Sequence, residues 1–166
     1  MLRRTLFAIA VFALGAAGGI AVHLLTAEGD TMFSGKRPAD LGLHEGRFST
    51  CARRLNCVSS FADPGDAQRY VAPIDVPDGA AKALAAARRA VEATPRARVV
   101  RHEANYLHAE FRTRILGFVD DVEFTYDERA GRLHVRSASR LGRRDFGVNR
   151  ARVEALRARI EAGLRA

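Results

Sequence analysis

The sequence predicts an α+β domain: an antiparallel sheet of four to five strands with two helices packed on one face, preceded by an N-terminal transmembrane helix. The sheet is predicted because residues 118–126 and 133–139 alternate apolar and polar side chains with a period of two, as half-buried strands do. The helices are predicted because residues 79–93 and 149–164 repeat apolar side chains at helical spacing. A chain of 166 residues is long enough for one such domain.

The hairpin of residues 118–126 and 133–139 is the centre of the predicted sheet. Its alternation places the carboxylate of Asp120 in an apolar row that faces the core. Asp121 belongs to the opposite face. The predicted core row of the first strand consists of Phe118, Asp120, Val122, Phe124 and Tyr126.

The register of this hairpin follows from the need to pair apolar residues with apolar residues. Asp120 is then expected opposite Ser137 or Ser139. The same register places Arg136 opposite an acidic residue of the outer face, either Asp121 or Glu123. Cross-strand pairs of this kind stabilise a sheet by roughly 0.2–1 kcal/mol each.

The other elements complete the predicted layer. Residues 70–74 are expected to form a short edge strand, and residues 98–103 and 106–113 two further strands. Asp78 is expected to cap the first helix and Asn149 the second, because both are favoured at helix N-caps.

The sheet face away from the helices is expected to be solvated or to meet a partner. Exposed ion pairs contribute little to stability, so a solvated charged face is the ordinary interpretation. Either His108 or Arg112 is within reach of Asp121 from the neighbouring strand. This face carries Glu110, Arg112, Asp121, Glu123, His134 and Arg136.

Residues 1–25 predict a membrane anchor. Arg3 and Arg4 precede an apolar run of about 21 residues, and a bilayer needs about 20. This charge bias predicts a single pass through the inner (cytoplasmic) membrane, with the C-terminal domain extracytoplasmic or periplasmic. A cleaved signal peptide is the alternative, but residues 25–27 (LTA) match a cleavage site poorly. The membrane, contacted through residues 5–25, is therefore one expected partner.

Residues 26–47 are expected to be a flexible tether, because their glycines and charges follow no period. Residues 48–166 are expected to form the single folded domain. Cys51 and Cys57 favour a disulfide in an exported domain, with free thiols as the alternative. A metal site is disfavoured, since structural zinc needs about four ligands and His44 is the only nearby histidine. No cofactor is expected.

The net charge of +8 suits contact with anionic surfaces, although a solvated arginine-rich surface is the ordinary interpretation. The chain has few aromatic residues, no tryptophan and no nucleic-acid-binding motif. No nucleic acid is therefore expected as a partner.

Four ordered motifs connect the chain to a known family. They are residues 56–60 (NCVSS), 117–124 (GFVDDVEF), 136–142 (RSASRLG) and 145–150 (DFGVNR). Together they resemble the bacterial and chloroplast family called domain of unknown function 1499, from about residue 48 to the C-terminus. The resemblance implies no established activity and brings no catalytic residues with it.

Asp120 is the first candidate site residue, because a buried carboxylate is unfavourable unless it is paired and hydrogen-bonded. Ser137 or Ser139 is expected to donate to it, with Arg140, Asn149 or Arg150 as further donors. A structural latch between loop and sheet is the first interpretation. A general acid or base with a raised pKa is the alternative.

The second candidate site is the loop 140–150, where arginines and glycines precede a helix N-terminus. Guanidinium groups and free backbone N–H groups at such a place can hold an anion. We expect a membrane-anchored binding or interaction module of the cell envelope, whose partner is an anionic ligand, a lipid headgroup or an envelope protein. The expected anion-binding residues are Arg140, Arg143, Arg144, Asn149 and Arg150.

Two alternatives come from other functional classes. A hydrolase-like enzyme would use Asp120 and Asp121 with His108 or His134, but the two aspartates face opposite sides of one strand. Residues 59 and 60, both serine, lack the GxSxG elbow of a serine nucleophile and are expected in loop or capping roles. A purely structural envelope protein is the other alternative.

Overall fold

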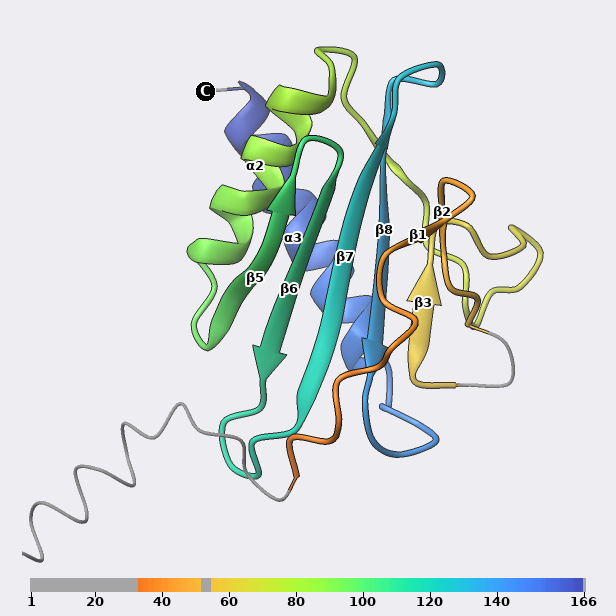
Figure 1. Ribbon diagram of the computed structural model, residues 1–166, viewed down its shortest axis with the longest axis vertical. Coiled ribbons are helices and arrows are strands. Elements are labelled where there is room, and N and C mark those ends of the chain that lie inside the picture. Colours follow the sequence, from red (N-terminus) through yellow and green to blue (C-terminus); the bar gives the residue numbers. More distant parts are fainter. Residues whose placement is uncertain (1–32, 52–54, 166) are drawn as a thin grey trace, which may run out of the picture. The chain divides into compact units, whose positions relative to one another are not determined.

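The computed structural model describes residues 33–51 and 55–165, and the predicted membrane segment lies outside these residues. The described chain is an antiparallel sheet with two helices on one face (Figure 1). No helix in these two ranges is long and apolar enough to cross a bilayer. The strands are β1 (Leu43–His44), β2 (Arg47–Phe48), β3 (Cys57–Ser59), β4 (Ile74–Asp75), β5 (Ala97–Glu103), β6 (Tyr106–Arg112), β7 (Val119–Asp127) and β8 (Arg132–Ser139); the helices are α2 (Ala80–Glu92) and α3 (Val148–Arg165).

The main sheet has six strands, rather than the four to five predicted. The predicted meander is confirmed, since β5, β6, β7 and β8 are neighbours in that order. β3 and β4 both pair with the free edge of β8. The predicted edge strand 70–74 is displaced, because only its last residue, Ile74, belongs to β4. β3 was missed because its three residues are all buried and show no alternation.

The predicted hairpin register is confirmed. Asp120 lies opposite Ser139, and Glu123 lies opposite Arg136. Asp120 therefore shares the face of β7 with Val122 and Phe124, which are fully buried beneath the helices.

The core lies between the sheet and the two helices. α2 brings a stripe of small side chains that lets it approach the strands closely, and α3 brings Val153, Leu156 and Ile160. Burying one such aliphatic side chain contributes roughly 1.5–3 kcal/mol. The buried alanines of α2 are Ala83, Ala86, Ala87 and Ala90.

Both predicted helix caps are wrong. The N-cap of α2 is Gly79, and Asp78 instead accepts a hydrogen bond from Lys82. At α3, the carboxylate of Asp145 accepts hydrogen bonds from the backbone N–H groups of Gly147 and Asn149. Because Asn149 lies inside the first turn, its side chain is available to contact the sheet.

The second face of the sheet is covered, which corrects the expectation of a solvated face. Residues 33–48, most of them predicted to be tether, run across β7 and β8 on the side opposite the helices (Figure 1). The Gly42 N–H donates to Glu123, and Arg37 donates to Glu110. We call residues 33–48 the N-terminal strap. Its contacts make it part of the folded domain.

The predicted disulfide is confirmed: Cys51 and Cys57 are bonded, with their Cα atoms 5.5 Å apart. Both cysteines are buried against Ala138 of β8. The bond therefore ties the end of the strap region to the start of β3.

Two glycines of the strap test how tightly it is seated. Gly35 and Gly46 both have positive φ, at 67° and 77°, so alanine at either position adopts a left-handed conformation that costs roughly 1–2 kcal/mol. A Cβ at Gly35 would also lie 2.9 Å from the Arg140 Cβ, whereas one at Gly46 meets no atom within 4 Å. We expect Gly35→Ala to lose about 1–3 kcal/mol more stability than Gly46→Ala, as overpacked sites do. Chemical denaturation measures the two losses of unfolding free energy. Equal losses would mean that the strap does not pack against Arg140 at the end of β8.

Candidate functional site

Three carboxylates lie side by side on the strap-covered face of the sheet. Glu110 of β6 is directly opposite Asp121 of β7, and Glu123 follows two residues further along β7. Each is at most 2% exposed. Like charges directly opposite each other destabilise a sheet, so this face requires buried cations.

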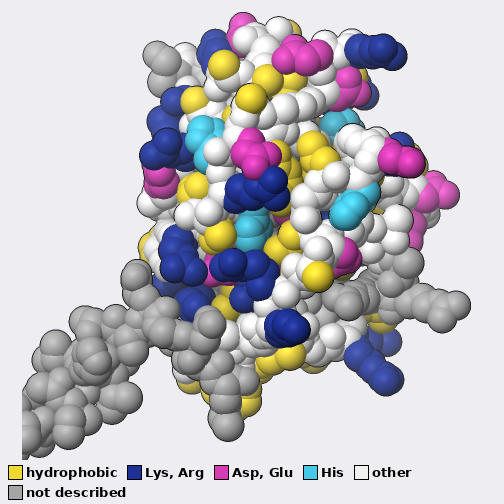
Figure 2. Space-filling view, viewed as in Figure 1, with side chains coloured by type: hydrophobic (Ala, Val, Ile, Leu, Met, Phe, Trp, Pro, Cys, Tyr) yellow, Lys and Arg dark blue, Asp and Glu magenta, His cyan; other side chains and the backbone are white. Residues whose placement is uncertain are grey.

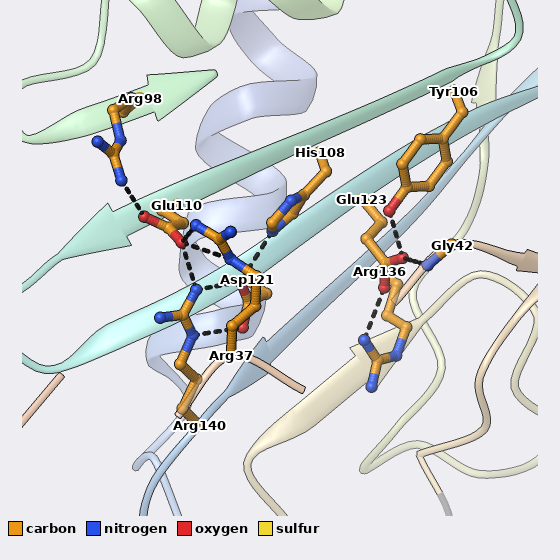
Figure 3. Close-up of polar contacts among 10 residues, drawn as sticks. All are labelled: Arg37, Gly42, Arg98, Tyr106, His108, Glu110, Asp121, Glu123, Arg136 and Arg140. Atoms are coloured by element: carbon orange, nitrogen blue, oxygen red, sulfur yellow. Dashed lines mark hydrogen bonds and ion pairs between the residues drawn. The ribbon is translucent and has the colours of Figure 1, made fainter. Parts of the chain in front are cut away.

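Arg140 supplies the central cation. Its guanidinium donates from Nε and Nη2 to the two carboxylate oxygens of Asp121, both at 2.8 Å. Nη2 also donates to Glu110 Oε1 at 2.5 Å (Figure 3). The Arg140 side chain is only 3% exposed. Burial alone would lower its pKa, but the two carboxylates outweigh burial and raise the pKa. We call Glu110, Asp121, Glu123 and their partners the buried charge layer.

Glu110 and Asp121, the two carboxylates that Arg140 contacts, also accept hydrogen bonds from other side chains. Arg37 of the strap and Arg98 of β5 donate to Glu110, at 2.6 and 2.7 Å. His108 Nε2 lies 2.8 Å from Asp121 Oδ1, which decides between the two residues predicted to reach Asp121. Burial by itself would raise the pKa of Glu110, but its three arginine partners lower that pKa to about 2.

Glu123 has its own set of donors. It accepts hydrogen bonds from Arg136 at 2.7 Å, from the Tyr106 hydroxyl at 2.7 Å and from the Gly42 N–H at 2.8 Å (Figure 3). Burial and the adjacent Glu123 charge raise the pKa of Tyr106, so it stays a donor. Because Gly42 belongs to the strap, the strap is bonded to the charge layer at this point as well.

Each carboxylate of the charge layer is paired with at least one arginine of the same domain. Every carboxylate in it accepts hydrogen bonds from at least two donors. Glu110, Asp121 and Glu123 line none of three surface pockets of the described residues, which have volumes of about 280, 320 and 540 Å³. In residues 33–51 and 55–165, no group of three or more His, Cys, Asp or Glu side chains could hold a metal ion. The hydrogen bonds of the layer join β6, β7, β8 and the strap.

Asp120, on the other face, has a partner that the sequence analysis missed. Arg152 of α3 donates to its carboxylate and lies over the Phe111 ring, 5.1 Å from the ring centre. The expected donors of Asp120 are engaged elsewhere. The Ser137 hydroxyl donates to Asn149 Oδ1 at 2.5 Å, and Asn149 Nδ2 donates to Ser139 Oγ at 2.9 Å.

Asn149 is the centre of this second network. Its side chain is fully buried, and it also donates to the backbone oxygen of Asn56 at 3.0 Å. The Asn56 side chain in turn donates to the carbonyls of Leu141 and Gly142, at 3.2 and 2.8 Å. The network thus joins Asn56, the residue before β3, to the end of β8 and the start of α3.

The segments that carry the sequence motifs therefore meet at one place in the structure. The family described as protein of unknown function (DUF1499) matches residues 47–160. The chain belongs to this family. No curated protein and no solved structure matches it. The DUF1499 match contains all three carboxylates of the charge layer, whereas Arg37 and Gly42 of the strap precede it.

Of the five predicted anion-binding residues of this DUF1499 protein, only Arg144 and Arg150 line one pocket together. Arg140 and Asn149 are used inside the two networks. Arg150 donates from Nη2 to the carbonyls of Ala67 and Tyr70, at 2.9 and 2.7 Å. Arg143 and Arg144 are exposed on the loop between β8 and α3.

A surface pocket of about 280 Å³ lies beside this loop. Arg144 and Arg150 line it together with Leu55, Gln68 and Phe146. Phe146 is 97% exposed and has a φ of 54°, a conformation that costs a residue with a side chain roughly 1–2 kcal/mol. An aromatic side chain is therefore held in solvent at the pocket rim by a strained turn.

His134 of β8 and Ser60, the residue after β3, form a hydrogen-bonded pair. Ser60 Oγ lies 3.0 Å from His134 Nδ1 and accepts a hydrogen bond from the Val135 N–H at 2.9 Å. The Phe61 ring stacks on the imidazole at 4.0 Å. Burial lowers the pKa of His134. The pair fastens the chain after β3 to β8, and it contacts neither Asp120 nor Asp121.

The charge layer predicts an acid-sensitive fold. The pKa of Glu110 is about 2 in the folded chain, against an ordinary value of 4.5, so the folded state binds fewer protons than the unfolded state. Its contribution to stability is present above pH 4.5 and is lost as the pH falls towards 2. Asp121, whose pKa is also lowered, adds in the same direction.

We expect Glu110→Gln to flatten the fall in unfolding free energy between pH 5 and pH 2. Exposed Glu128→Gln is the control. Denaturant titrations at a series of pH values measure both slopes, and parallel curves for the wild type and Glu110→Gln would refute the assignment.

A second prediction concerns Glu123 and Arg136. Glu123→Gln leaves the buried guanidinium of Arg136 without its carboxylate and is expected to destabilise the domain by roughly 3–5 kcal/mol. The double variant with Arg136→Met removes both charges and should recover much of that loss. A double-mutant cycle in urea measures the coupling, and additive losses would contradict it.

Proposed function

We propose that this DUF1499 protein is a membrane-anchored binding module of the cell envelope. Residues 5–25 hold it in the cytoplasmic membrane, with the α+β domain on the extracytoplasmic side. The pocket at the start of α3 binds the anionic group of a ligand that also has an apolar part. The observation that carries the proposal is the combination of two arginines and an exposed aromatic ring on one pocket.

Arg150 is the fixed element of this pocket. Its two carbonyl contacts both use Nη2 and hold the guanidinium against the loop of residues 67–70. A guanidinium has five N–H donors in a planar fork, which suits a phosphate or carboxylate. Arg144, which is exposed, adds a second cation. Asp145 also lines the pocket, and its carboxylate accepts hydrogen bonds from the backbone N–H groups of Gly147 and Asn149.

The apolar part of the ligand is inferred from the remaining walls. Leu55 and Val58 line the pocket together with the arginines, and the exposed Phe146 ring also lines it. Pockets that bind small molecules combine apolar walls with a few placed polar groups. The ligand class that fits is an amphiphilic phosphate or carboxylate.

A binding function has more support than hydrolysis, because both candidate catalytic carboxylates are buried and paired with arginines. Asp120 is 3% exposed and paired with Arg152, and Asp121 is 1% exposed and paired with Arg140. A general acid or base has to reach the proton that it transfers. The hydrolase alternative therefore has less support than the binding module.

The test uses the full-length protein in a neutral detergent, with hexyl phosphate, inorganic phosphate and hexanol as probes. Hexyl phosphate is expected to bind most tightly, since only it satisfies both the arginines and the apolar walls. Arg144→Glu should weaken its binding at least about tenfold, because a hydrogen bond to a charged group is worth roughly 1.5–3 kcal/mol. Isothermal titration calorimetry measures the affinities.

Arg143→Glu is the matched control, because Arg143 is an exposed neighbour that does not line the pocket. It makes the same change in net charge and should have the smaller effect. Equal affinities for the wild type and Arg144→Glu would refute the pocket as the anion site.

A further inference from the structure

Most of the exposed large apolar side chains of the described residues lie at one end of the sheet. Seven such residues are exposed in residues 33–51 and 55–165, and only Leu43 lies elsewhere, in the strap strand β1. Ile115 is 90% exposed and Phe146 is 97% exposed. The six at this end are Phe33, Ile115, Leu116, Leu141, Phe146 and Val148.

Apart from Val148, the first residue of α3, these residues come from three segments that lie at the lower end of the sheet in Figure 1. The segments are the start of the strap, the β6–β7 loop and the β8–α3 loop. Figure 2 shows hydrophobic side chains at this end, with lysine or arginine side chains among them. We call these three segments the loop end.

Direct contacts make the loop end one surface. The Phe33 ring lies 5.5 Å from the Phe118 ring, at the base of the β6–β7 loop. Arg112, at the end of β6, donates to the Ser34 hydroxyl at 3.0 Å. Gly35 lies directly against Leu141 of the β8–α3 loop. The start of the strap is therefore wedged between the two loops.

The charge of the loop end is positive. Arg114 flanks Ile115, and Arg143 and Arg144 precede Phe146; all three arginines are exposed. The one acidic residue of these loops, Asp145, accepts hydrogen bonds from the start of α3. Exposed apolar tips beside arginines fit an interface of lipid headgroups, where aromatic side chains concentrate and each basic residue adds attraction to anionic lipid.

The chain itself brings the loop end to a membrane. Only seven residues, 26–32, separate the apolar run from Phe33. An extended chain advances at most about 3.6 Å per residue, so the eight steps from residue 25 to Phe33 span at most about 29 Å. If residues 5–25 cross the bilayer, the end of the domain at Phe33 cannot be further than this from its surface.

We infer that the loop end is a membrane-contact surface. Ile115 and Phe146 insert into the interfacial layer of the bilayer in which residues 5–25 are anchored. Arg114, Arg143 and Arg144 contact lipid phosphate groups. The inference rests on the membrane anchor of the proposed function and deepens it: the amphiphilic phosphate of the α3 pocket is a phospholipid, because Arg144 and Phe146 belong to both surfaces.

The absence of tryptophan from the whole sequence permits a direct test. Phe146→Trp and Ile115→Trp each introduce a single fluorophore at an exposed tip, and Arg129→Trp does so in the β7–β8 turn at the other end of the sheet (Figure 1). Each full-length variant is reconstituted into phosphatidylethanolamine–phosphatidylglycerol vesicles, with and without lipids brominated on their acyl chains. Tryptophan emission and its quenching are then measured.

We expect blue-shifted emission and strong quenching for Phe146→Trp and Ile115→Trp, and neither for Arg129→Trp. Adding Arg143→Glu and Arg144→Glu to Phe146→Trp should reduce the quenching, as should leaving out the anionic lipid. Quenching of Phe146→Trp and Ile115→Trp no stronger than that of Arg129→Trp would overturn the contact surface.

Alkaline carbonate extraction of the full-length chain separates this failure from failure of the proposed function. If carbonate releases the wild-type chain from membranes, the anchor fails and the contact surface fails with it. If the chain is retained but the tips are not quenched, only the contact surface fails.

Discussion

The guanidinium of Arg140 is the contact on which the rest of the structure depends. Glu110 and Asp121 face each other across β6 and β7, and the sheet is unfavourable there unless a cation lies between them. Arg140 binds both carboxylates from the end of β8, where the chain turns towards α3. One side chain therefore fixes the sheet, the strap beside Gly35 and the loop that leads to the α3 pocket. Without Arg140, Asp121 would keep only His108, and Glu110 would keep the half-exposed Arg37 and Arg98.

Because this charge layer is buried, the β8–α3 loop is a better candidate for ligand binding than the charged face of the sheet. A sheet face rich in acidic and basic side chains resembles a binding surface when only the sequence is seen, and Figure 2 still shows lysine and arginine side chains on that face. The strap covers the carboxylates beneath it, and these carboxylates accept hydrogen bonds from donors within the domain. Two of the exposed arginines, Arg143 and Arg144, lie on the β8–α3 loop, beside the exposed apolar side chains of Leu141 and Phe146. The same chain thus separates charges that stabilise the fold from charges that can meet a ligand.

The hairpin could be predicted from the sequence because its parity is fixed by apolar residues with a period of two. Asp120 and Asp121 were assigned to the correct faces for that reason. The strap could not be predicted, because β1 and β2 have two residues each and its attachment depends on single contacts from Arg37 and Gly42. Such contacts leave no period in the sequence. Arg152 was missed for a related reason: α3 carries many arginines, and helical spacing alone does not tell which of them meets a buried carboxylate.

The central claim is that the strap is an integral layer that seals the buried charges. Hydrogen–deuterium exchange of the full-length protein, read residue by residue, tests it most directly. The account predicts that the Gly42 amide, which donates to Glu123, exchanges as slowly as the amides of β7, and that both lose protection together in Glu123→Gln. Exchange of Gly42 at the rate of an unstructured peptide, with β7 still protected, would contradict it.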